Sequence, residues 1–134
     1  MKKRLCVLLL SLCCLGGLFA QIKNSPVVGE WIYRGKNETC ELEFDRDGDA
    51  TIEVYSAGTK FEWEGTWTVS NDEIVFNVNR VEFENKSFGQ KEERKAKTSQ
   101  IFRITFSIVN GKLTITCPDL PQEITSGLYE RYYD

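Results

Sequence analysis

Acidic residues are the commonest side chains in this sequence that can do chemistry, with 20 among 134 residues. Asp45, Asp47 and Asp49 occupy alternate positions, as the first three ligands of a calcium-binding loop do. The glycine and the bidentate glutamate that such a loop requires are replaced by Ala50 and Ser56. We therefore interpret this segment as a charged turn and predict no metal site.

Histidine is absent from the chain, which excludes histidine-dependent triads, histidine general bases and histidine metal sites. No nucleophile stands beside a base, and no glycine-rich phosphate loop is present. We predict that the protein is not an enzyme, has no catalytic residue and carries no cofactor. The remaining prominent carboxylates lie at alternate positions of extended segments, where water solvates them: Glu41, Glu43, Glu53, Glu62 and Glu64.

Residues 1–20 have the pattern of a secretory signal peptide. A basic start, Lys2-Lys3-Arg4, precedes a short apolar run that closes on Leu18-Phe19-Ala20. The sequence predicts export to the bacterial periplasm or the medium, with residues 21–134 as one domain and no transmembrane segment after cleavage.

Removing this leader changes the charge and the cysteine content. It takes three of the 17 basic residues and none of the 20 acidic ones, so 14 remain against 20, a net charge of about −6. This balance argues against a nucleic-acid partner. Of the five cysteines, Cys40 and Cys117 remain. They form either one disulfide, which an oxidising compartment favours, or two buried thiols that act as apolar fillers.

The dominant period of the chain is two. Apolar Phe61, Trp63, Trp67 and Val69 alternate with polar residues, and several other segments do the same, which is typical of strands with one buried face. Turn sequences such as Asn110-Gly111 separate these segments. The pattern predicts eight strands at about 28–35, 38–45, 49–56, 60–69, 73–83, 100–109, 112–117 and 126–133.

Short turns join consecutive strands and favour a meander. We predict an all-β fold, an eight-stranded antiparallel up-and-down barrel, with a two-sheet sandwich as the competing architecture. The glutamate-bearing face must point to water and the apolar face to the interior. Residues 84–99 lack alternation and are interpreted as a polar loop, either simply solvated or a mobile flap or anion-attracting arm.

The first predicted strand carries Gly29-Glu30-Trp31. This G-x-W motif, with Arg131 in the last strand, resembles the lipocalins and their calycin relatives, in particular the small lipocalin-like domains of exported bacterial proteins. The resemblance implies that Trp31 covers one end of the barrel and that Arg131 packs over its indole, with Gly29 beside them. These roles are structural.

Two functions are compatible with these observations. The resemblance implies that the barrel interior binds a small hydrophobic ligand, although so many aromatic rings leave little room. Alternatively, a packed barrel binds an envelope protein or inhibits a basic enzyme such as a lysozyme or a protease, with the acidic face steering the partner. We expect a monomer in either case. The candidate lining residues are Phe44, Trp63, Trp67, Phe76, Arg80, Phe102, Ile104 and Phe106.

Overall fold

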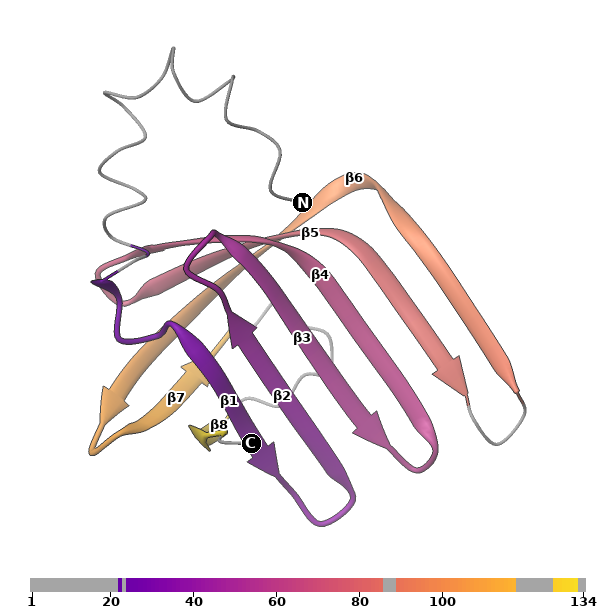
Figure 1. Ribbon diagram of the computed structural model, residues 1–134, viewed down its shortest axis with the longest axis horizontal. Coiled ribbons are helices and arrows are strands. Elements are labelled where there is room, and N and C mark those ends of the chain that lie inside the picture. Colours follow the sequence, from indigo (N-terminus) through magenta and orange to yellow (C-terminus); the bar gives the residue numbers. More distant parts are fainter. Residues whose placement is uncertain (1–21, 23, 86–88, 118–126, 133–134) are drawn as a thin grey trace.

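The computed structural model describes residues 22, 24–85, 89–117 and 127–132. Eight strands form a closed barrel in which each strand pairs with its neighbours in chain order (Figure 1). The predicted all-β, antiparallel, up-and-down barrel is confirmed. The strands are β1 (Gly29–Arg34), β2 (Glu38–Phe44), β3 (Asp49–Ser56), β4 (Thr59–Ser70), β5 (Glu73–Asn85), β6 (Gln90–Val109), β7 (Lys112–Thr116) and β8 (Gly127–Arg131).

Residues that alternate in the sequence point alternately into the barrel and out of it. In β2, Cys40, Leu42 and Phe44 are buried, whereas Glu41 and Glu43 between them are half-buried on the outer face. This arrangement removes the apolar half of each strand from water and leaves the carboxylates solvated. The largest fully buried side chains are Trp31, Trp67, Tyr129, Phe44 and Phe76.

The backbone conformation of the turns agrees with the types of residue that occupy them. Asn110 and Gly111 both have positive φ, 53° and 76°, as a tight two-residue hairpin between β6 and β7 requires. Asn71 has the same left-handed conformation, φ 53°, between β4 and β5. These turns fix the register of their hairpins, and that register places the side chains of the outer face.

The segment interpreted as a loop, residues 84–99, is largely strand. β5 continues to Asn85 and β6 begins at Gln90, and residues 80–85 pair with residues 90–95. We call these paired residues the β5–β6 extension. Its β6 half shows no apolar alternation in the sequence, and its pairing with β5 defines it as a strand. β6 pairs with β7 only over residues 105–109, so the extension continues past β7 in Figure 1.

Two irregularities bend the sheet where the extension begins. The β4–β5 register shifts between Glu64 and Gly65, and the β5–β6 register shifts between Val78 and Arg80. A Cβ atom on Gly65 would lie 1.7 Å from the carbonyl oxygen of Asn77, so the two strands approach at a distance that only glycine permits. These bulges decide which face each later side chain of β5 occupies.

The predicted leader, residues 1–20, lies outside the described residues. Within the described ranges, no helix has both the length and the apolar character needed to cross a membrane.

Candidate binding face on the outer barrel wall

The predicted lining residues fill the barrel interior. Phe44, Trp67 and Phe76 are 0–1% exposed, and Trp63, Phe102 and Ile104 are also buried. The Phe44 and Trp67 ring centroids lie 5.1 Å apart, and the Trp67 indole donates a hydrogen bond from Nε1 to the Asp45 carbonyl oxygen at 2.9 Å. Phe106 is half-buried at the margin of this core. Side chains therefore already occupy the places that the sequence offered as a ligand chamber.

Arg80 does not line the interior, contrary to the prediction. Its side chain lies on the outer face, where Nε is 3.1 Å from Glu64 and Nη2 is 3.2 Å from Glu82. Strict alternation from the buried Val78 would turn residue 80 inward. The bulge between Val78 and Arg80 inserts one extra residue, so Arg80 faces outward and Val81 takes the inner face.

Trp31 of β1 and Arg131 of β8 are cross-strand partners. The Arg131 guanidinium lies 3.9 Å from the centroid of the Trp31 ring, and it donates hydrogen bonds to the carbonyl oxygens of Val28 and Pro26 at 2.6 and 2.7 Å. A Cβ atom on Gly29 would lie 2.5 Å from Arg131 Nη1, so a glycine leaves room for the guanidinium. The arrangement covers a buried indole with a hydrogen-bonded cation.

Cys40 and Cys117 are both buried, and neither forms a disulfide with another described cysteine. Cys40 instead contacts the Tyr129 hydroxyl. Burial is the main cause that raises the pKa of Tyr129 far above its ordinary value, so this hydroxyl stays protonated. Of the two arrangements that the sequence left open, the structure contains the buried thiols.

Glutamates stand in register across four neighbouring strands on the outside of the barrel. Glu41 is paired with Glu53, Glu53 with Glu62, and Glu62 with Glu82. On the other edge of β2, Glu43 is paired with Glu30 of β1. Like charges directly opposite one another repel, so this arrangement needs compensation. We call this surface the acidic face and define it as Glu30, Glu41, Glu43, Asp45, Glu53, Glu62, Glu64 and Glu82.

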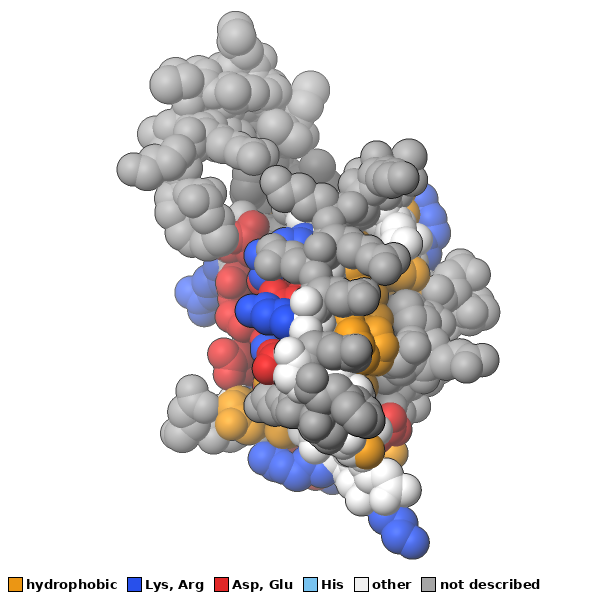
Figure 2. Space-filling model, turned by 90° about the vertical axis from the view of Figure 1, so that its right-hand side faces the viewer, with side chains coloured by type: hydrophobic (Ala, Val, Ile, Leu, Met, Phe, Trp, Pro, Cys, Tyr) orange, Lys and Arg blue, Asp and Glu red, His pale blue; other side chains and the backbone are white. Residues whose placement is uncertain are grey.

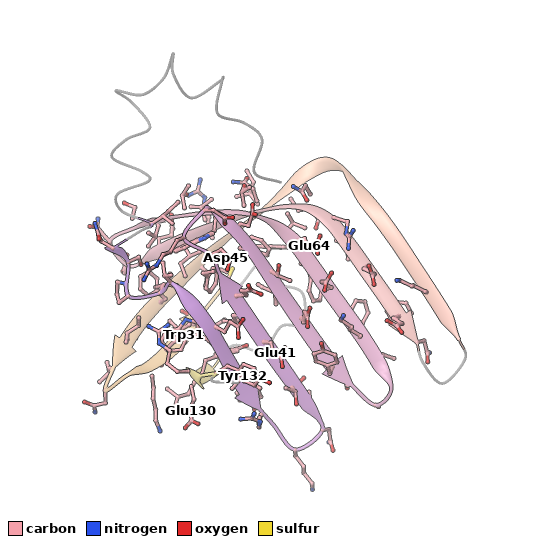
Figure 3. All side chains as sticks on the ribbon, in the orientation of Figure 1. Trp31, Glu41, Asp45, Glu64, Glu130 and Tyr132 are labelled. Carbon is pink, nitrogen blue, oxygen red and sulfur yellow. The ribbon has the colours of Figure 1, made fainter. Side chains whose placement is uncertain are left out.

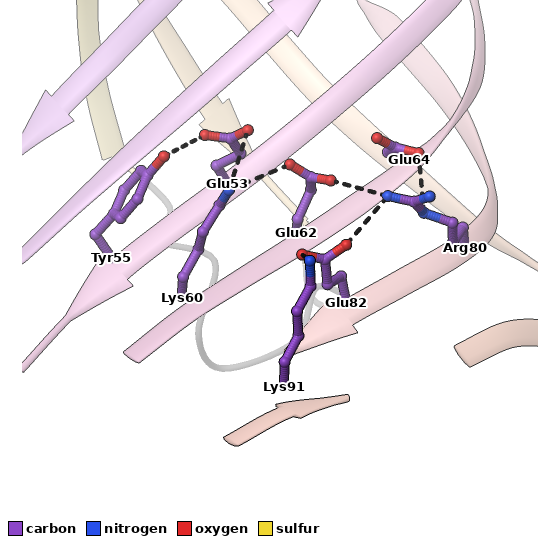
Figure 4. A network of polar contacts seen from close by, with 8 residues as sticks. All are labelled: Glu53, Tyr55, Lys60, Glu62, Glu64, Arg80, Glu82 and Lys91. Atoms are coloured by element: carbon purple, nitrogen blue, oxygen red, sulfur yellow. Dashed lines mark hydrogen bonds and ion pairs between the residues drawn. The ribbon is translucent and has the colours of Figure 1, made fainter. Parts of the chain in front are cut away.

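Three cations compensate the half of the acidic face that lies on β3, β4 and β5 (Figure 4). Lys60 Nζ lies 3.9 Å from Glu53 and 3.6 Å from Glu62. Arg80 contacts carboxylates of both β4 and β5, and Lys91 lies 3.5 Å from Glu82. Figure 2 shows red and blue side chains in one band beside a separate hydrophobic band.

The β1–β2 half of the acidic face differs. The ion pairs of Lys60 reach Glu53 on β3 but no carboxylate of β1 or β2. Among the described residues, no ion pair joins a cation to Glu30, Glu43 or Asp45. A hollow of about 200 Å³ lies over this half. Figure 3 labels Glu41 and Tyr132, which both line it. Its lining consists of Glu30, Trp31, Glu41, Leu42, Glu43, Thr51, Glu53 and Tyr132.

Two carboxyl groups of this hollow, those of Glu43 and Glu41, have raised pKa values. Desolvation and a hydrogen bond with the Asp45 side chain raise the pKa of Glu43 from 4.5 to about 7, and the charges of Asp45, Glu30 and Glu53 act in the same direction. Desolvation and the charge of Glu53 also raise the pKa of Glu41. Ionisation of Glu43 and Glu41 is therefore less favourable than that of a solvated glutamate, and a nearby cation would favour it.

Main-chain contacts hold Asp45 beside Glu43. The Asp45 amide donates to the Asp49 carbonyl oxygen at 2.9 Å, and its own carbonyl oxygen accepts from Gly48 and from Trp67. The Asp47 carboxylate accepts from the Asp49 amide at 3.1 Å, as an aspartate in a turn does. The structure has no group of three or more potential metal ligands among the residues that it describes.

Comparison of the chain with family models, curated proteins and solved structures gives no match. The assignment of a function therefore depends on the geometry of the acidic face and of the core beneath it.

Several residues of the acidic face and its hollow were not predicted from the sequence. Glu30 and Glu82 of the face, and Tyr132 of the hollow, lie far apart in the chain, and the barrel register brings their segments to one side of the sheet. One signal was available in the sequence, since the Ala57-Gly58 turn of a tight hairpin by itself places Glu53 opposite Glu62.

Proposed function

We propose that this protein is a non-enzymatic binding module whose acidic face recognises a basic surface of another protein. The carrying observation is the uncompensated half of the face, where Glu30 and Glu43 line a hollow and form no ion pair with a described cation. A cation placed there by a partner relieves repulsion between carboxylates that are already partly desolvated. The filled interior supports binding from the outside of the barrel rather than inside it.

The shape of the face fits a protein surface. It extends over β1–β5, and in its compensated half lysine and arginine side chains form ion pairs with the glutamates. A negative surface of this kind attracts a positively charged partner over distances of about 10 Å at ordinary ionic strength. We also propose that the chain is exported and is related to the lipocalins, as the sequence predicts. An exported protein meets proteins of the envelope or the medium, so the proposed partner is a basic protein of that compartment, such as a lysozyme.

Binding of a basic lysozyme, measured by isothermal titration calorimetry at pH 8, tests this proposal. Replacing Glu30 and Glu43 together by Gln removes two charges from the uncompensated half. Two such charges, at about 0.7 kcal/mol each, correspond to about a tenfold loss of affinity. The matched control, D72N/E73Q, removes the same charge at the β4–β5 turn and should bind like the wild type. Equal affinity of both double variants would show that only net charge matters and would reject the face.

A second candidate function is capture of a small apolar ligand on the inner side of β4 and β5, next to the β5–β6 extension. Phe61 stacks on Trp63 with ring centroids 5.6 Å apart and contacts Phe83 at 4.7 Å. Phe61 and Phe83 are only half-buried, unlike the rings inside the barrel. Such a platform offers aromatic area without the displacement of any core residue.

A fluorescent apolar dye tests the second candidate. Fatty acid should displace the dye from the wild type, and the F61S/F83S variant should bind the dye at least tenfold more weakly. The E30Q/E43Q variant should bind the dye normally, because the acidic face lies on the other side of the sheet. Dye binding that survives F61S/F83S unchanged would exclude this platform.

A further inference from the structure

The described residues that precede β1 are anchored to the barrel, although they belong to no strand. Ile22 is 3% exposed and Val27 is 0% exposed, and both are part of the same hydrophobic core cluster as the strands. The Ser25 amide donates a hydrogen bond to the Ile22 carbonyl oxygen at 3.2 Å, and the Ser25 carbonyl oxygen accepts one from the Val28 amide at 3.3 Å. We call Ile22 and residues 24–28 the N-terminal anchor.

The cation and the indole described above hold this anchor by its main chain. Three consecutive carbonyl oxygens of the anchor accept hydrogen bonds from the two side chains. Trp31 Nε1 donates to Val27 at 2.8 Å, and Arg131 donates to Val28 from Nη1 and to Pro26 from Nη2, at 2.6 and 2.7 Å. Release of the anchor therefore breaks three hydrogen bonds and exposes apolar side chains to water.

The N-terminal anchor begins directly after the predicted leader, which ends at Ala20. Hydrolysis of the Ala20–Gln21 bond adds one water molecule, which leaves a carboxyl group on Ala20 and an amino group on Gln21. Ile22 is the second residue on the product side of this bond. A peptidase binds accessible, extended chain around the bond that it cuts, and a side chain inside the core is not accessible to it.

We propose that the closed barrel protects its own processing site, so that a leader peptidase cuts the chain only while the N-terminal anchor is undocked. Export then has a fixed order, in which the leader is removed first and the anchor packs against Trp31 and Arg131 afterwards. A chain that folds before it is cut keeps its leader. This inference goes beyond the proposed function, because it concerns how the folded barrel is made and not what its outer face binds. It rests on the proposed export of the chain.

The test uses the full-length chain, refolded in mild detergent, and a purified bacterial leader peptidase. Tryptophan emission shows that each sample is folded before the enzyme is added. Burial of one isoleucine side chain predicts that the folded chain is cut about tenfold more slowly, or slower still, than the same chain unfolded in urea that the peptidase tolerates. Equal rates for the folded and the unfolded chain would overturn the proposal.

Two variants assign the protection to the anchor. Ile22→Ser removes the buried side chain, so folded I22S should be cut faster than the folded wild type. Unfolded I22S and unfolded wild type should be cut at equal rates, which excludes an effect on the preference of the peptidase. Gly48→Ala strains the β2–β3 turn, where φ is 92°, and controls for a general loss of stability. G48A should keep the protection of the wild type. Folded I22S that is cut as slowly as the wild type, or no faster than G48A, would reject the anchor as the cause.

Amide hydrogen exchange of the exported protein tests the anchor without any refolding. The Ser25 and Val28 amides donate within the anchor, so both should exchange slowly in the wild type. In I22S the Ser25 amide should exchange faster, while core amides such as that of Phe106 stay protected. Exchange of Ser25 and Val28 in the wild type at the rate of an unfolded peptide would show that the anchor is not docked. Lysozyme takes no part in these measurements, so their failure and the failure of the proposed function are separate results.

Discussion

Replacing Glu43 by Gln should stabilise the folded protein at pH 8, although a charged surface residue is usually of little consequence for stability. In the wild type, the ionised Glu43 lies beside Asp45 and Glu30 and is partly desolvated, and its pKa is raised from 4.5 to about 7. This penalty is fully present above pH 7 and is relieved as the pH falls from about 7 toward 4.5, where the folded protein holds the proton more tightly than the unfolded chain. Wild-type stability should therefore rise on mild acidification.

The magnitude follows from that shift after allowance for solvent. A difference of 2.5 pKa units corresponds to about 3.4 kcal/mol for a fully buried group. Glu43 is only half-buried, and water and salt screen its neighbours, so we expect about 1 kcal/mol. For a domain of this size, 1 kcal/mol moves the melting temperature by about 4 °C.

Urea denaturation and thermal melting of the wild type, E43Q and the control E73Q at pH 5 and pH 8 measure the effect. E43Q should gain about 1 kcal/mol at pH 8 and almost nothing at pH 5. E73Q, whose carboxylate is paired with Arg103 at 3.0 Å, should gain nothing at either pH. A loss of stability in E43Q at pH 8 would refute the reasoning, because it would mean that the charge of Glu43 is favourable where it lies.

Two further predictions concern the framework of the face. Gly65→Ala should destabilise the protein by about 2 kcal/mol or more, because the added Cβ overlaps the Asn77 carbonyl. In the control Gly48→Ala the added Cβ meets no atom within 4 Å, so this variant should lose less stability. Urea denaturation of both variants measures the difference in the free energy of unfolding. Arg131→Ala should lose about 1–2 kcal/mol by uncovering Trp31 and freeing two carbonyl oxygens, and a red shift of tryptophan emission should accompany the loss in melting temperature.

The fold was predictable because it depends on local patterns. Alternation of apolar and polar residues defines each strand, and the residues at the turns join consecutive strands into antiparallel pairs. The β5–β6 extension was missed for the same reason. The sequence of its β6 half, from Gln90, is a run of charged residues without alternation, and its pairing with β5 is a contact that alternation does not record.

The acidic face was predictable only in part. Glu41, Glu43, Glu53, Glu62 and Glu64 were predicted to point outward, and they do. The position of Arg80 among them depends on a bulge, and strict alternation turns this residue the wrong way. The position of Asp45 depends on how the β2–β3 turn is anchored to Trp67, 22 residues away in the chain, and no local pattern reports such a contact.

The most direct test of the account is the affinity of a basic lysozyme for the E30Q/E43Q variant, measured beside the D72N/E73Q control at pH 8 and low salt. E30Q/E43Q should bind lysozyme about tenfold more weakly than the control, and this difference in affinity should become smaller as salt is added. Indistinguishable affinities of the two variants would contradict the claim that the outer wall over β1 and β2 is where this barrel meets its partner.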